Sequence, residues 1–136
     1  MKKHEIFDLI SKSKPDLSWA GDRTIFLTIH GSRAYGTNLP ESDTDIKGII
    51  IPPKEYYLGA LHKLEQIELK NPYPDAALYE IRKFFTLAMN NNPNLIEVLH
   101  TDPSDHLIVS PMGEEILEHK NEFLSKTRST LERTLK

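Results

Sequence analysis

The stretch that decides the fold is residues 24–51, TIFLTIHGSRAYGTNLPESDTDIKGIII. Residues 24–30 are rich in β-branched and aromatic side chains and are apolar on both faces, which is typical of a strand buried inside a sheet. Residues 43–51 are also rich in β-branched side chains and end before two prolines, so they predict a second strand. Residues 38–42 have the composition of a loop. The stretch therefore predicts two strands joined by a turn and a loop.

Polar residues lie at the end of the first predicted strand and at the start of the second. The first strand ends in Gly31 and Ser32, whose backbone N–H groups and hydroxyl suit phosphate oxygens, next to the start of a short helical turn that favours anions. The second strand opens with Asp43 and Asp45, which alternation places on one face, ~7 Å apart. A hard divalent cation relieves the repulsion between two such carboxylates, and Mg²⁺ is held by carboxylates together with substrate phosphates. This pairing is what transfer from a nucleoside triphosphate requires.

Each of these features also has an ordinary explanation. Most isolated Asp-x-Asp pairs are solvated turn residues, and an isolated Gly-Ser is a weaker signal still. Their joint order favours the functional interpretation: a buried strand, Gly-Ser, ten residues, then Asp-x-Asp-Ile at the start of a strand. Arg33 follows the turn directly and is either a clamp on the triphosphate, because guanidinium matches phosphate geometry, or an exposed surface arginine.

Outside this stretch the pattern predicts one more strand and several helices. The order is helix, strand, turn, strand, strand and then helices, so the predicted fold class is α+β (mixed α/β), with strands concentrated between residues 24 and 80. A few extended residues are expected after Asp75. The expected elements are an amphipathic helix at 3–14, a strand at 63–69, a helix carrying Leu78, Ile81, Phe85 and Ala88, a short helix holding Leu95, Val98 and Leu99, and C-terminal helices at about 111–135 with Met112 and Ile116 on an apolar stripe.

Length and composition set limits on the class of protein. The chain has 136 residues, so we expect one domain over residues 1–136 with a catalytic core at about 20–100. A net charge of −3 argues against a nucleic-acid binder that depends on bulk positive charge, and the absence of cysteine excludes disulfides and thiolate metal sites. The longest aliphatic run is three residues, far below the ~20 of a membrane span, and the first residues lack an apolar signal core. We therefore expect a cytoplasmic protein that does not associate with membranes.

The segments GSRAYGT (31–37) and SDTDIKG (42–48) resemble the signature of the DNA polymerase β-like nucleotidyltransferase superfamily. The resemblance is closest to its bacterial and phage branch associated with RNA repair, and it continues downstream in IRKF (81–84), NP (92–93) and EVL (97–99). Lys47 stands where arginine is common in this branch. Relatives often continue into a longer helical region, so the chain is either a short version or a fragment.

The resemblance implies a small nucleotidyltransferase sheet flanked by helices, with a third carboxylate on a strand before the helix that begins near Tyr79. Asp75 is the first choice for this carboxylate, because it opens an extended stretch, and Glu80 is the alternative. Together with Asp43 and Asp45, the third carboxylate would bind two Mg²⁺ ions, with Mn²⁺ as a substitute. The resemblance also implies that Lys83 reaches the phosphates.

The expected activity is transfer of a nucleoside monophosphate, AMP from ATP, onto an RNA end or a protein hydroxyl, with release of pyrophosphate. Two other functions stay open. One is an antitoxin-like or regulatory module that nucleotidylates or binds a partner protein. The other is a nucleotide-binding relic without turnover. Sequence alone leaves the acceptor, the base preference and the oligomeric state open.

Overall fold

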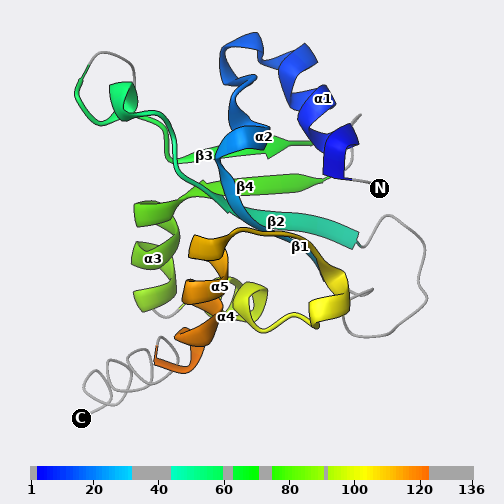
Figure 1. Ribbon diagram of the computed structural model, residues 1–136, viewed down its shortest axis with the longest axis vertical. Helices are drawn as coiled ribbons and strands as arrows, with labels where there is room; N and C mark the ends of the chain where they lie inside the picture. The colour runs from blue at the N-terminus through cyan, green and yellow to red at the C-terminus, as the bar shows by residue number, and fades with distance from the viewer. Residues whose placement is uncertain (1–2, 32–43, 60–62, 71–74, 91, 123–136) are drawn as a thin grey trace.

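The computed structural model describes residues 3–31, 44–59, 63–70, 75–90 and 92–122 of the chain. Its centre is a five-stranded mixed sheet in the order β3-β4-β2-β1-β5 (Figure 1). The strands are β1 (Thr24–Gly31), β2 (Thr44–Ile50), β3 (Gln66–Leu69), β4 (Ala76–Glu80) and β5 (His106–Val109). The helices are α1 (Lys3–Ser13), α2 (Ala20–Arg23), α3 (Ile81–Met89), α4 (Pro93–Leu99) and α5 (Pro111–Glu118), with 3₁₀ turns η1 (Pro15–Leu17), η3 (Lys54–Tyr56) and η4 (Pro103–Asp105).

The central strand pairs in the sheet run in different directions. β1 and β2 are antiparallel, with Gly31 opposite Thr44, so β1 ends where β2 begins. β2 and β4 are parallel, with Ile46 opposite Ala76, so both strands begin at the same edge of the sheet. The outer strands β3 and β5 pair antiparallel with β4 and β1. The end of β1 and the starts of β2 and β4 therefore share one edge of the sheet.

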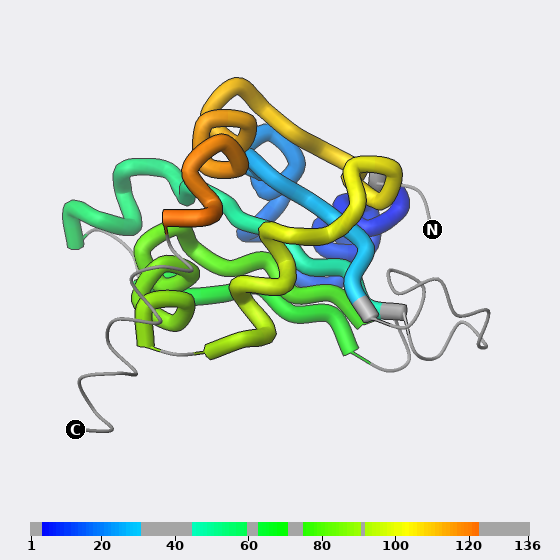
Figure 2. Tube along the Cα trace, turned by 90° about the horizontal axis from the view of Figure 1, so that it is seen from below, coloured from blue at the N-terminus to red at the C-terminus, as the bar shows by residue number. Residues whose placement is uncertain are grey.

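Helices cover both faces of the sheet and bury two apolar clusters. α1 and α2 lie over one face and α3, α4 and α5 over the other (Figures 1 and 2). On the α1 side Leu27, Ile46 and Leu78 pack with apolar residues of α1 and α2. On the α3 side Phe26 and Ile49 pack with apolar residues of α3 and α4. Because both faces are covered, the central strands are apolar on both sides, as residues 24–30 predict.

Gly48 of β2 lies where the sheet packs most closely. A Cβ at this position would lie 2.6 Å from the carbonyl oxygen of Phe26 and within 3 Å of the side chains of Leu27 and Leu78. Only glycine fits without moving backbone, so this glycine of the SDTDIKG segment has a packing role in β2.

The predicted α+β class is correct, and most predicted elements are found. The helix at 3–14, the strands at 24–30 and 43–51, and the helix break between Asn90 and Pro93 all agree with the structure within a few residues. The strand predicted at 63–69 is shorter and begins at Gln66. The turn expected at 34–37 lies outside the described residues.

Three predictions about elements were wrong. Leu78 belongs to β4 and not to the following helix, which begins at Ile81, because pairing with β2 and burial on the α1 side hold this stretch extended. β5 was not expected, since its four residues carry little pattern and form a strand only by pairing with β1. Met112 of α5 is 48% exposed and does not share a buried stripe. The rest of that stripe, beyond residue 122, lies outside the described residues.

Among the residues that the structure describes, no helix combines the length and apolar character needed to cross a bilayer.

Candidate functional site

Three of the predicted site residues lie at one edge of the sheet. Gly31 is the last residue of β1, Asp45 is the second residue of β2, and Asp75 directly precedes β4. The amide of Ile46 donates a hydrogen bond of 3.1 Å to the carbonyl oxygen of Asp75, which extends the parallel pairing to this position. Figure 2 shows this edge at the right, where the described part of β1 ends. We call it the acidic edge, defined by Gly31, Asp45 and Asp75.

The two carboxylates of the acidic edge, those of Asp45 and Asp75, lie on the same face of the sheet. Ile46 and Ala76, which are paired, bury their side chains on the α1 side. Since side chains alternate along a strand, Asp45 and Asp75 lie on the opposite, α3 side. Asp45 is half-buried and Asp75 is exposed. Neither carboxylate group forms a hydrogen bond or ion pair with another described residue. Two adjacent carboxylates without a neutralising partner in this part of the chain have the donor chemistry that a hard divalent cation takes.

The charge of Asp45 acts on the neighbouring side chains. The pKa of Tyr79 on β4 is raised, first by burial and then by the negative charges of Glu68 and Asp45. Tyr79 lies on the same face, two positions along β4 from Ala77. The carboxylates of Glu68 and Asp45 therefore lie close enough to Tyr79 to disfavour its ionisation.

His30 forms the other side of the acidic edge. It is paired with Asp45 across the antiparallel strands, so the two side chains share a face. Its Nε2 lies 3.4 Å from Oε2 of Glu97 on α4. This contact agrees with the structural role that its place before Gly31 suggests. It also brings α4, which carries the EVL segment, next to the acidic edge.

Lys47 is a candidate that the sequence reasoning did not assign to the site. It lies two residues after Asp45, on the same face, in the row formed with Thr28 and Ala77. Its side chain is half-buried, and it has no ion pair or hydrogen bond to any residue of the described ranges. A cation beside carboxylates and without a fixed partner suits a phosphate oxygen. The i, i+2 spacing from Asp45 is the signal in the sequence that could have identified Lys47 as a site residue.

Glu80, the alternative third carboxylate, lies at the opposite end of β4. It is opposite Ile50 and separated from Asp75 by five residues, or about 16 Å at ~3.3 Å per residue. Its carboxylate caps α3, accepting hydrogen bonds from the amides of Arg82 and Lys83, both at 3.0 Å. It also accepts a 2.6 Å bond from the hydroxyl of Tyr57. The structure therefore brings Asp75, and not Glu80, next to Asp45.

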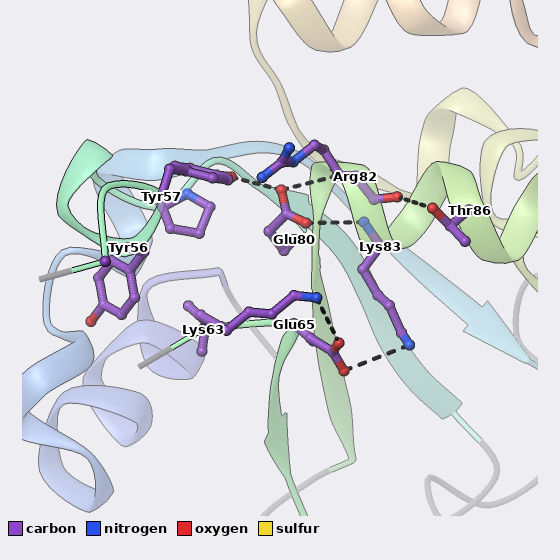
Figure 3. A pocket seen from close by; sticks show the side chains of 11 residues that line it. Tyr56, Tyr57, Lys63, Glu65, Glu80, Arg82, Lys83 and Thr86 are labelled. Atoms are coloured by element: carbon purple, nitrogen blue, oxygen red, sulfur yellow. Dashed lines mark hydrogen bonds and ion pairs between the residues drawn. The ribbon is translucent and has the colours of Figure 1, made fainter. Parts of the chain in front are cut away.

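Lys83 is also away from the acidic edge. It lies in the first turn of α3, where its Nζ is 3.6 Å from Oε2 of Glu65, just before β3 (Figure 3). The amide of Glu80 is bonded to the carbonyl of Glu65 at 2.9 Å, so this ion pair belongs to the Glu80 end of the sheet. The resemblance implied that Lys83 reaches the phosphates. The structure places Lys83 at the Glu80 end of the sheet, away from Gly31.

The remaining predicted site residues, Ser32, Arg33 and Asp43, lie outside the described residues. Within the described ranges, no three side chains of the His, Asp and Glu type gather closely enough to hold a metal ion. The predicted metal site needs Asp43 as well, so its full ligand set is still a prediction.

A cavity of about 620 Å³ opens at the Glu80 end of the sheet (Figure 3). Its walls come from η3 and the residues after it, from the approach to β3, and from the start of α3. We call it the far cavity. It contains Glu80 and Lys83 together with Tyr57, Lys63 and Arg82.

Comparisons with known proteins agree with the resemblance of the central segments. A model of the RlaP family, described as an RNA repair pathway DNA polymerase beta family, matches residues 4–132. An uncharacterized 38.9 kDa protein in the nrdC-mobD intergenic region of Enterobacteria phage T4 is 33% identical over 89 residues, covering 60% of this chain and 26% of that protein. The uncharacterized protein YcgL of Bacillus subtilis strain 168 is 32% identical over 83 residues, covering 60% of this chain and 32% of that protein. The matched region thus spans about a quarter to a third of these relatives.

Proposed function

The chain belongs to the RlaP family, the RNA repair pathway DNA polymerase beta family, and we propose that it is a metal-dependent nucleotidyltransferase that moves AMP from ATP onto an RNA end. The observation that carries the proposal is the acidic edge. Asp45 and Asp75 lie on one face of adjacent parallel strands, beside the end of β1.

In this proposal different residues near the acidic edge bind the phosphates and the metal. Gly31 and Ser32 hold the β- and γ-phosphates through backbone N–H groups and a hydroxyl. Arg33 and Lys47 offer positive charge to the phosphate oxygens. Asp43, Asp45 and Asp75 would hold Mg²⁺, which would supply neutralisation of phosphate charge when bound. Asp45 and Asp75, the two of these residues that the structure describes, fit this ion because both offer carboxylate oxygens.

The chemistry is a single displacement at the α-phosphate. Asp75 orients the acceptor hydroxyl and accepts its proton, directly or through water. The hydroxyl oxygen bonds to the α-phosphorus while the bond from that phosphorus to the bridging oxygen breaks, and pyrophosphate leaves. His30, held by Glu97, keeps the face beside Asp45 ordered.

The test is transfer of label from ATP labelled at the α-phosphate, in the presence of Mg²⁺, to a single-stranded RNA with a free 3′ hydroxyl. Asp45→Asn should abolish transfer. Asp8→Asn on the exposed face of α1 is the matched control and should retain it. Label on a co-purified protein would favour the antitoxin-like or regulatory alternative, and absence of label on every acceptor would favour a nucleotide-binding relic.

A further inference from the structure

The far cavity has the size of a ligand site and lies away from the acidic edge. Its volume of about 620 Å³ is within the range of ~300–1,000 Å³ that small-molecule sites occupy. It is formed by three segments between Pro52 and Thr86, and Figure 3 shows the side chains of Tyr57, Arg82 and Glu80 close together near those of Lys63, Glu65 and Lys83. Gly31, Asp45 and Asp75, which the proposal assigns to triphosphate and metal, lie at the other end of β4. The cavity therefore needs a different occupant.

One wall of the far cavity is an aromatic ring stacked with a guanidinium group. The Cζ atom of Arg82 lies 4.9 Å from the ring centroid of Tyr57. The Tyr57 ring is held in place by its hydroxyl, which donates to Glu80, and it remains 39% exposed. Aromatic rings and arginine planes are the surfaces on which proteins stack the bases of single-stranded nucleic acids. This wall therefore suits a base.

On the opposite wall, two lysines form ion pairs with one carboxylate. Nζ of Lys63 and Nζ of Lys83 lie 3.5 Å and 3.6 Å from oxygens of Glu65. Among the residues that line the cavity, Lys63, Lys83 and Arg82 outnumber the carboxylates of Glu65 and Glu80, which leaves a formal charge of +1. In a chain of net charge −3, such a local excess of positive charge favours an anionic group. This wall therefore suits a backbone phosphate.

The position of the far cavity relative to the acidic edge suits a nucleic-acid strand better than a free nucleotide. Asp75 and Glu80 stand at the two ends of β4, about 16 Å apart at ~3.3 Å per residue. α3, which forms part of the cavity, covers the same face of the sheet that carries Asp45. A single strand with its terminal hydroxyl at the edge would have to span this distance to reach the cavity with a nucleotide further along the chain.

We infer that the far cavity binds one nucleotide of the single-stranded RNA acceptor, with its base against Tyr57 and Arg82 and its phosphate toward Lys63 and Lys83. This inference rests on the proposed function, since it names the place where the acceptor of that reaction is held. A protein acceptor would need neither a stacking wall nor paired lysines.

The test measures binding of a fluorescein-labelled oligoribonucleotide by anisotropy, without ATP or metal, over a series of salt concentrations. The double variant Lys63→Ala with Arg82→Ala should bind at least about 10-fold more weakly, because the guanidinium part of the stacking wall and one of the two phosphate contacts are lost. Its dependence of log affinity on log salt should become shallower by about 0.7 for each phosphate contact removed. Lys63 and Arg82 are both exposed, so the fold should tolerate their loss. Lys12→Ala on exposed α1 is the matched control and should bind as the unmodified chain does.

A second measurement locates the RNA directly. An oligoribonucleotide that carries 4-thiouridine should crosslink on irradiation to the segment around Tyr57 or to the start of α3, as read by mass spectrometry. Crosslinks confined to other segments, or equal RNA affinity of the double variant and the unmodified chain, would overturn the inference. So would a double variant that loses binding to a partner protein but not to RNA.

The outcomes also separate this inference from the proposed function. A chain that transfers label to RNA while the double variant binds RNA normally contradicts the role of the far cavity and leaves the nucleotidyltransferase proposal intact. A chain that transfers no label, yet binds RNA through Tyr57 and Arg82, contradicts the proposed reaction and supports the cavity as an RNA site.

Discussion

The amide of Ile46 donates a 3.1 Å hydrogen bond to the carbonyl oxygen of Asp75, so the residue before β4 lies next to the start of β2. It places Asp75 beside Asp45 on the neighbouring strand, on the face opposite the buried side chain of Ile46. Glu80, at the other end of the same strand, is engaged in holding the start of α3. Asp75 and Glu80 therefore lie at opposite ends of β4, and Glu80 has a structural role as the cap of α3.

Asp75→Asn should lower nucleotidyl transfer while leaving the fold intact. The exposed Asp75 side chain supports no hydrogen bond within the described residues, so the free energy of unfolding should change little. Loss of a metal ligand should cost at least the ~10–100-fold that loss of its outer-shell partners costs. Transfer is measured with ATP labelled at the α-phosphate. Full activity in this variant would mean that Asp75 is not part of the site.

Lys47→Met should weaken binding of the nucleoside triphosphate. If Lys47 contacts a phosphate, a charged hydrogen bond worth about 1.5–3 kcal/mol is lost, so KM should rise ~10–100-fold. Lys47→Arg should restore most of the affinity, because it keeps the charge and because arginine is common here in the resembling branch. Lys12→Met controls for the general loss of a lysine. An unchanged KM with lower thermal stability would instead assign Lys47 a structural role.

Glu80→Ala should destabilise the protein through the start of α3. The change removes the side-chain cap of Arg82 and Lys83, worth about 0.5–2 kcal/mol, and leaves the Tyr57 hydroxyl without its acceptor. Urea unfolding measures the effect, with Glu55→Ala on exposed η3 as the matched control. Because Glu80 also holds the Tyr57 ring of the far cavity, transfer is measured at saturating RNA, where its rate per folded molecule should stay within a few-fold of normal. A stable Glu80→Ala variant that has lost transfer would reverse the assignments of Asp75 and Glu80.

Stability should fall at high pH through Tyr57. Partial burial, and then its hydrogen bond to the negatively charged Glu80, raise the pKa of Tyr57 from 10.0 to about 12. The Tyr57 hydroxyl therefore holds its proton more tightly in the folded state than in the unfolded state. Its contribution to the free energy of unfolding is complete below pH 10 and is lost as the pH rises toward 12. The melting temperature of the unmodified chain should approach that of Tyr57→Phe over this range. A constant difference between the two would contradict the raised pKa.

Local pattern predicted much of the fold correctly because each signal acts over a few residues. The strand at 24–30, the amphipathic helix at 3–14 and the break before Pro93 depend on side-chain alternation, amphipathic spacing and capping. Leu78 and β5 were misjudged because their conformation depends on a partner strand distant in sequence. The position of Lys83 was hidden for a similar reason, since its ion pair with Glu65 joins segments that only the folded sheet brings together. Its contact with the phosphates stays a prediction.

By itself, the sequence predicted a buried strand that ends at Gly31 and a second strand that carries Asp45 near its start, because strand composition and spacing are local signals. The placement of Asp43 on the same face as Asp45 stays a prediction. The tertiary structure alone decided which strand lies beside β2 and in which register. That register, set by burial of Ile46, Gly48 and Leu78 against the α1 side, brings Asp75 to the acidic edge and leaves Glu80 at the far cavity. The sequence preferred Asp75 to Glu80 only because Asp75 opens an extended stretch, and the pairing of strands from distant parts of the chain shows which of the two lies beside Asp45.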